Sequence, residues 1–449
     1  MKQNEIAVFF KKSINFGFYS LALFSPLSIS GTQAALAIIL LSWTALMITE
    51  KRFIFAKTPL NYPFLAYLCA VFIGAIFGID FIYSIKSMSK FWIALTFFAM
   101  LTFIEDIKMI RRLVHIILLV TSIVSIYGVL QHVFPGLDIV RPEGRKVVQW
   151  ADGGIASTGF FDHHMTYGGF LLLVFSLSFS LSLSRIQQIV KSKQFFSLPA
   201  ACCLLPTILI SAGLLSSMTR NGWLGAVFAV IFIVILKVKR KIIAFSIVCL
   251  IITSYFLLPT SYLLHSPILN RFKSIFDISK NVERLYIWKS AADMIMEHPI
   301  TGVGMNNYTA AIKSYRDKYG HDFSAGSDAH AHNNVLTQAA EHGILGFTAF
   351  LWIWIVFFRE GIKIFRSRKS GVGSRTGVPP VKESGVRSQE TKIDGNEDKF
   401  QNAITLGGLG AIAGFHVAGI FEANFGDAEV ATMAWFIMGL VFLMKKDNI

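Results

Sequence analysis

Long apolar runs separated by short polar segments repeat along almost the whole chain of 449 residues. A helix needs about 20 apolar residues to cross the hydrocarbon core of a bilayer. The pattern predicts an all-α polytopic membrane protein with about twelve transmembrane helices, forming one integral membrane domain over residues 1–449. The candidate spans lie near residues 13–30, 34–49, 61–79, 85–104, 113–133, 166–184, 199–217, 222–236, 241–258, 343–358, 403–421 and 428–444.

Three polar stretches interrupt the spans. Residues 134–165 form a loop rich in Gly and Pro. Residues 259–342 form the largest loop, and their periodic segments predict a helical subdomain. Residues 367–400 contain Gly, Ser, Pro and charged residues but no aromatic residue before Phe400, which predicts a disordered linker.

Composition supports the membrane assignment. The chain is 54% hydrophobic and only 15% charged, whereas a soluble domain carries about a quarter charged residues. The net charge of +15 suggests nucleic acid in a soluble protein. Here we interpret it as topology, because Lys and Arg concentrate in the cytoplasmic loops of membrane proteins. We therefore expect membrane lipids as partners and no nucleic acid.

The charge distribution predicts the orientation of the chain. With the N-terminus in the cytoplasm, cytoplasmic segments hold 28 of the 42 Lys and Arg but only 11 of the 27 acids. The opposite side holds 14 basic and 16 acidic residues. Both termini are therefore predicted to be cytoplasmic, the 367–400 linker as well, and the 259–342 loop lies on the other side of the membrane.

Two arginines map to that external side. Arg220 lies in the sequence SSMTRNGW between two apolar runs, where an arginine either faces an anionic partner or extends to the interface. Arg284 and Trp288 are four residues apart and share a helical face. Nearby acids also allow Arg284 a purely structural ion pair.

The segment SDAHAHNN offers three interpretations. Asp328, His330 and His332 have an alternate spacing that suits metal ligands on an extended segment. One histidine would instead suit a general base, because its pKa lies near neutral pH. In the third interpretation Asp328 or Asn333 only caps the following helix and the histidines are solvated.

Two cations beside a potential base suit a substrate with an anionic leaving group. Pyrophosphate is such a group, and arginine binds phosphate oxygens bidentately. A donor carried on a lipid would explain why such a site belongs to a membrane protein. Glu422, in the last external loop, is either a partner of these arginines or an ordinary loop acid.

At these residues the chain resembles the O-antigen ligase family, within a superfamily that includes O-antigen polymerases and protein O-oligosaccharyltransferases. Three segments carry the resemblance. They are SSMTRNGWLGAV with Arg220, RLYIWKSAADMIMEHPITGVGMNNY with Arg284, and the spacing H-N-x9-G-x-x-G from His332 to Gly346. STGFFDHHMTYGGF and FEANFGDAEVATMAWFIMGL are also similar to family segments.

The resemblance implies a GT-C-like fold and a metal-independent, inverting glycosyltransferase without a cofactor. Such an enzyme moves a glycan from undecaprenyl pyrophosphate to a hydroxyl of lipid A–core oligosaccharide, in lipopolysaccharide biosynthesis. The active site then faces the periplasm from the bacterial inner membrane. Carried over to this chain, the resemblance assigns His332 as general base and Arg220 and Arg284 to the pyrophosphate. The expected substrate-binding residues are His330, Asn333, Trp288, His163 and Glu422.

Other functions stay open at this point. A polymerase or protein O-oligosaccharyltransferase of the same superfamily would differ in its acceptor, which no motif in the sequence specifies. A polysaccharide transporter or flippase would perform no chemistry. It would place its ionisable residues near the bilayer midplane on broken helices, whereas the candidate residues here lie in external loops and at span ends.

Overall fold

The computed structural model describes residues 2–134, 137, 148–149, 155–192, 198–237, 282–319, 330–374 and 387–445. These residues are almost entirely helical. The one exception is a short antiparallel pair of strands, β1 (Val148–Gln149) and β2 (Ile155–Ala156). The helices are α1 (Lys2–Phe24), α2 (Ile29–Glu50), α3 (Asn61–Ile76), α4 (Phe81–Met88), η1 (Ser89–Ala94), α5 (Leu95–Phe103), α6 (Ile107–Val133), α7 (His164–Ser192), α8 (Leu198–Ser216), α9 (Arg220–Lys237), α13 (Val282–Glu297), α14 (Tyr308–Tyr319), α15 (Asn334–Ser374), α16 (Arg387–Ala418), η4 (Asn424–Gly426) and α17 (Ala428–Leu443).

Several of these helices suit a bilayer, which makes the chain a multi-pass membrane protein. Among the described residues, five helical segments are long and apolar enough to cross it: Ile29–Glu50, Ile107–Val133, His164–Ile189, Arg220–Lys237 and Asn334–Arg368. Shorter apolar helices cover Asn61–Ile76, Leu204–Ser216 and Ala428–Leu443. The all-α membrane fold is confirmed, and the number of twelve spans stays a prediction.

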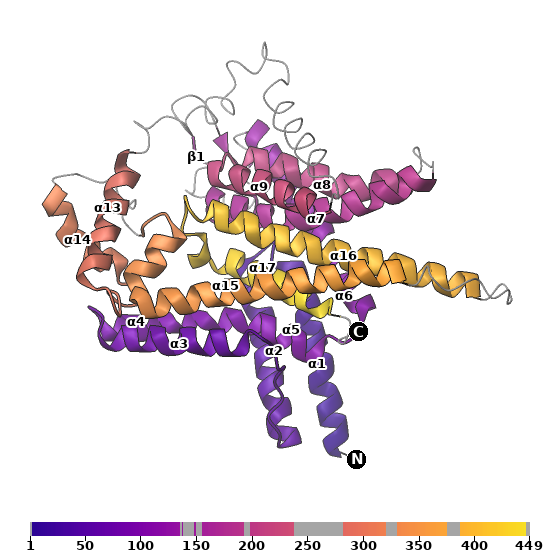
Figure 1. Ribbon diagram of the computed structural model, residues 1–449, viewed down its shortest axis with the longest axis horizontal. Coiled ribbons are helices and arrows are strands. Elements are labelled where there is room, and N and C mark those ends of the chain that lie inside the picture. The colour runs from indigo at the N-terminus through magenta and orange to yellow at the C-terminus, as the bar shows by residue number, and fades with distance from the viewer. Residues whose placement is uncertain are drawn as a thin grey trace, which may run out of the picture.

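The centre of the bundle is α16, which packs along both α7 and α9. Gly225 of α9 and Gly414 of α16 face each other so closely that a Cβ on either residue would overlap the partner's backbone. Small residues let membrane helices approach in this way, because association in lipid depends on packing rather than on the hydrophobic effect. In Figure 1, α16 lies beside α15 along the long axis of the molecule.

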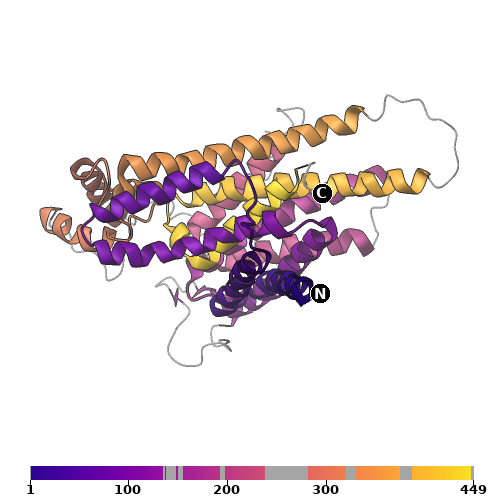
Figure 2. The same cartoon turned by 90° about the horizontal axis from the view of Figure 1, so that it is seen from below.

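One end of the bundle carries the helical subdomain. There α13 and α14 lie beside the beginning of α15 in both views (Figures 1 and 2). The three helices share a small apolar core of their own, which includes Ile287, Met294, Tyr308, Ile312 and Ala340. This core joins α13 and α14 to the beginning of α15.

The hairpin of α1 and α2 runs in a different direction from α15 and α16. In Figure 1 it points away from the long axis along which α15 and α16 run, and Figure 2 shows it nearly end-on. Its two helices pack mainly on each other, and α1 also contacts α6. Trp43 anchors the lower part of α2, because its Nε1–H donates to the backbone oxygen of Ile54 at 2.8 Å.

Some elements differ from those that the sequence pattern predicts. The expected span 85–104 is divided among α4, η1 and α5. The helices α15 and α16 extend into the expected linker, over residues 367–374 and 387–400, because contacts of Arg368 with Gln401 and Asp398 hold the two helices together there. The expected span 241–258 lies outside the described residues, as do parts of the 259–342 loop.

Candidate active site

The predicted histidines directly precede α15, and Asn333 caps that helix. The Asn333 Oδ1 atom accepts hydrogen bonds from the backbone N–H groups of Val335 at 2.9 Å and Leu336 at 3.1 Å. An asparagine at this position satisfies donors that the first helical turn leaves unpaired. Its carbonyl oxygen is therefore occupied by capping, and a contact of Asn333 with substrate stays a prediction.

The backbone of this segment is held in an uncommon conformation. His332 has a φ angle of 45°, which a residue other than glycine adopts only when its surroundings impose it. One constraint comes from Trp288 of α13, whose Nε1–H donates to the backbone oxygen of Ala331 at 3.0 Å. Trp288 thereby links the histidine segment to α13.

A second constraint joins the start of α15 to the end of α16. The backbone N–H of Asn334 donates to the oxygen of Gly419 at 2.6 Å. Its side-chain Nδ2 donates to Oδ1 of Asn424 at 2.9 Å. These bonds bring the loop that contains Glu422 against the histidines, although the two segments lie some 90 positions apart in the sequence.

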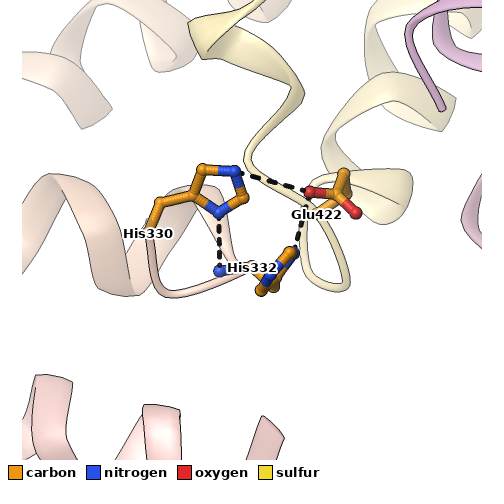
Figure 3. Close-up of side chains that lie close together, drawn as sticks. All are labelled: His330, His332 and Glu422. Atoms are coloured by element: carbon orange, nitrogen blue, oxygen red, sulfur yellow. Dashed lines mark hydrogen bonds and ion pairs between the residues drawn. The ribbon is translucent and has the colours of Figure 1, made fainter. Parts of the chain in front are cut away.

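Glu422 is the centre of the charged cluster in Figure 3. Its Oε1 atom lies 3.0 Å from Nδ1 of His332 and 3.9 Å from Nε2 of His330. Its Oε2 atom lies 3.9 Å from a terminal nitrogen of Arg284. The residue is only 5% exposed, so a carboxylate at this position depends on these partners for its charge.

The partners determine the ionisation of the cluster. Burial alone would raise the pKa of the Glu422 carboxyl. The hydrogen bond with His332 and the charges of His332, His330 and Arg284 outweigh it and lower the pKa to about 2. Burial, together with the neighbouring charge of His332, lowers the pKa of His330. Glu422 is therefore an anion at neutral pH.

His163 and Asp427 adjoin the same cluster. Burial lowers the pKa of His163, which precedes α7 and interacts electrostatically with Glu422 and His332. Asp427 accepts a hydrogen bond from the Thr166 hydroxyl at 2.9 Å. Burial and the nearby charge of Glu422 raise the pKa of Asp427 to about 7. The site thus contains a second carboxyl that exchanges protons near neutral pH.

Arg220 is the first residue of α9 and is half-buried at the same end of the bundle. The turn before it is well ordered, since the Ser217 and Thr219 hydroxyls lie 2.7 Å apart and Met218 has a φ angle of 55°. The ion pairs described for Glu422 are with Arg284, His330 and His332. They do not test whether Arg220 binds pyrophosphate, so that role stays a prediction.

The glycines of two sequence motifs meet each other. Gly302 and Gly343 have φ angles of 70° and 57°, and a Cβ on Gly302 would overlap the backbone of Glu341. The backbone N–H of Ile344 donates to the oxygen of Pro299 at 2.8 Å. These glycines therefore dock the segment after α13 onto a kink in α15 at Gly343.

A cavity of about 310 Å³ extends from the cluster into the bundle. Polar residues line one part of it, among them His330, Lys90 and Gln338, while Phe64 and Trp354 line another part. The Tyr67 hydroxyl donates to Oε1 of Gln338 at 2.5 Å. The space has the amphipathic lining that a substrate with a polar head and an apolar chain requires.

The cluster also has the composition of a metal site. One ligand atom from each of His330, His332 and Glu422 lies within 4.8 Å of the others, and these groups suit a divalent transition metal. The sequence interpretation paired the histidines with Asp328, which lies outside the described residues. The 3.0 Å contact of His332 with Glu422 equally forms a direct hydrogen bond.

Residues 205–351 match the family model described as O-antigen ligase. This match confirms the resemblance that the motifs predicted, and it covers about a third of the chain. It includes Arg220, Arg284 and both histidines, while Glu422 lies beyond it. None of the curated proteins matches the chain. Members of the O-antigen ligase family are glycosyltransferase-like membrane enzymes that use lipid-linked glycans.

Sequence reasoning did not find every residue of the site. It did not name Asp427, Lys90, Tyr67 or Gln338 as site residues. Lys90 carries a signal that could have found it, because it is a charged residue within the predicted span 85–104. Tyr67 and Gln338 carry none, since their pairing depends on the packing of α3 against α15.

Proposed function

We propose that the protein is an inverting glycosyltransferase that moves a glycan from undecaprenyl pyrophosphate to a hydroxyl of lipid A–core oligosaccharide. One observation carries the proposal. A buried carboxylate, Glu422, holds His332 and Arg284 together next to an amphipathic cavity. The O-antigen ligase match over residues 205–351 supports the same conclusion.

In this mechanism His332 is the general base. If Nδ1–H donates to Glu422, Nε2 is the nitrogen that accepts a proton. The acceptor oxygen attacks the anomeric carbon while its proton moves to Nε2. A sugar hydroxyl is a poor nucleophile, and a positioned base contributes about 10²–10⁴-fold to the rate. Glu422 orients the ring and stabilises the imidazolium that forms.

The leaving group is the pyrophosphate of the lipid carrier. The bond from the anomeric carbon to the pyrophosphate oxygen breaks, and the electron pair leaves with that oxygen. Arg284 keeps donors available, because its contact with Glu422 is 3.9 Å long and a quarter of its side chain is exposed. Arg284 and Arg220 neutralise the charge as it develops. A single displacement inverts the anomeric configuration, and the mechanism needs no metal.

The site geometry favours transfer over transport. His332 and Glu422 lie in loops that join helices, at the end of the bundle where α13 and α14 are found. A transporter would carry such groups at the bilayer midplane. We place the protein in the bacterial inner membrane, with the site in the periplasm and both termini in the cytoplasm, in accord with the charge distribution.

A reconstituted assay tests the proposal. Purified protein in lipid vesicles receives a lipid-linked glycan and either lipid A–core or a second lipid-linked unit. We expect glycan on lipid A–core. Extension of the second unit would make the protein a polymerase, and transfer to a peptide hydroxyl a protein O-oligosaccharyltransferase. Movement of the intact lipid-linked glycan across the membrane without a product would support a flippase.

Two further arms address the base and the metal. Activity that survives a chelator supports the metal-free mechanism, whereas loss with chelator and recovery with a divalent ion would assign His330, His332 and Glu422 as ligands. The variant Asp427→Asn tests the second carboxyl, because a group with a pKa of about 7 also suits a general base. We expect the variant to retain transfer.

A further inference from the structure

A second polar pocket lies at the other end of the bundle from Glu422. It is formed where α6 begins, where α7 ends and where α16 enters the bundle, and its volume is about 150 Å³. Two of these helices, α6 and α7, contain candidate membrane spans, and the end of a spanning helix lies near the lipid headgroups. None of the residues proposed for glycan transfer lines it.

Two arginines provide the charge of this pocket. The Arg111 guanidinium stacks over the ring of Phe400, with its central carbon 5.0 Å from the ring centre. Stacking uses the face of the guanidinium and leaves its N–H groups free to donate along the edges. Arg185 donates one hydrogen bond to Oε1 of Gln188 at 3.2 Å and retains further donors.

The rest of the lining is neutral or basic. His115 also lines the pocket, and the charges of both arginines act on its ring. Ser184, Gln188 and Asn396 add polar groups. None of the described lining residues is acidic, and a site with two guanidinium groups and no carboxylate suits an anion. Its size is appropriate for a single phosphate group.

We propose that this pocket binds the phosphate group of an anionic phospholipid. Basic pockets between transmembrane helices bind anionic lipid headgroups in this manner. Phe400 and Leu181 provide apolar surface in the pocket, next to the two arginines. Because the lining comes from three helices, a bound headgroup also joins the start of α6 to α7 and α16.

Native mass spectrometry of the full-length protein in mild detergent tests this inference. The probes are phosphatidylglycerol, phosphatidylcholine and inorganic phosphate. The test variant is Arg111→Gln/Arg185→Gln. The control is Arg112→Gln, since Arg112 is the exposed neighbour of Arg111 and does not line the pocket. Each hydrogen bond to a charged group contributes about tenfold or more, so we expect a loss of about 100-fold in the double variant.

The outcomes are distinct. Preference for phosphatidylglycerol over phosphatidylcholine, lost in the double variant and retained in Arg112→Gln, supports the site. An equal loss of phosphatidylglycerol binding in Arg112→Gln would mean that general surface charge explains the binding, and it would overturn the proposal. Binding of inorganic phosphate as tight as that of phosphatidylglycerol would assign a soluble anion and reject the lipid. Size-exclusion profiles establish that the exposed substitutions leave the fold intact.

Discussion

Two arginines at opposite ends of the bundle each face a carboxylate, but their surroundings differ. Arg368, near the end of α15, has a side chain that is only 3% exposed. Its Nε–H donates to the backbone oxygen of Met444 at 2.6 Å, and NH1 contacts Gln401 and Asp398. Arg284 has a side chain that is 25% exposed, and its contact with Glu422 is 3.9 Å long.

The difference separates a structural arginine from one that is available to a ligand. Arg368 directs its donors to fixed acceptors on two other helices, so it joins α15 to α16 and to the end of α17. Arg284 has a longer contact with Glu422, and a quarter of its side chain is exposed. A buried charge is retained only where its hydrogen bonds are satisfied, and a partly exposed guanidinium without that requirement can bind an incoming phosphate.

Removal of the proposed base should have the largest effect. In His332→Ala we expect glycan transfer to fall by about 10³-fold, because the acceptor hydroxyl loses the group that accepts its proton. The rate is measured with purified protein in vesicles. His298→Ala, at an exposed histidine of the same external region, is the matched control. Wild-type transfer by a correctly inserted His332→Ala protein would eliminate His332 as base.

The charge-conserving variant Arg284→Lys should have the next largest effect. Lysine keeps the positive charge but cannot reproduce the planar fork that binds phosphate oxygens. We expect a loss of about 10²-fold in kcat with an almost unchanged Tm. A large fall in Tm would mean that Arg284 is structural, as Arg368 is, and the contrast between the two ends would fail.

Arg368→Ala should show the opposite behaviour. The substitution leaves the backbone oxygen of Met444 and the Gln401 amide without their donor, so the protein should lose about 3 kcal/mol of stability. Transfer per folded molecule should be unchanged. Thermal unfolding in detergent measures the loss, with Arg366→Ala at an exposed neighbour as control. Impaired catalysis at full stability would refute the assignment.

The sequence predicted the membrane class because hydrophobic length is a local property. A run of apolar residues such as 113–133 has few stable alternatives to a spanning helix. It also predicted the family resemblance, because motif spacing is read directly from the chain. The side of the membrane on which Arg284 and His332 lie stays a prediction from the charge distribution. The family match bears out the resemblance.

The sequence alone did not predict the features that depend on tertiary contacts. The sequence offers no reason for Glu422 rather than Asp427 to contact His332, because that choice depends on how Asn334 docks on Gly419. The kink at Gly343 resembles ordinary helix in its hydrophobic pattern, and only its φ angle of 57° reveals it. The direction of the α1–α2 hairpin is likewise a consequence of packing.

Acid pH provides the mildest test of the contrast, because the Glu422 carboxyl has a lowered pKa in the folded protein. The pKa of Glu422 is about 2 in the folded protein, below its ordinary value of 4.5. A carboxyl with a lowered pKa contributes stability that is fully present above pH 4.5 and is lost as pH falls towards 2. Wild-type Tm should therefore decline over that interval by more than the Tm of Glu422→Gln, because the glutamine side chain takes up no proton in this range. The groups that face Glu422 are His330, His332 and Arg284. Parallel Tm curves for the two proteins would show that the ionised Glu422 carboxylate contributes no stability through its contacts with His330, His332 and Arg284.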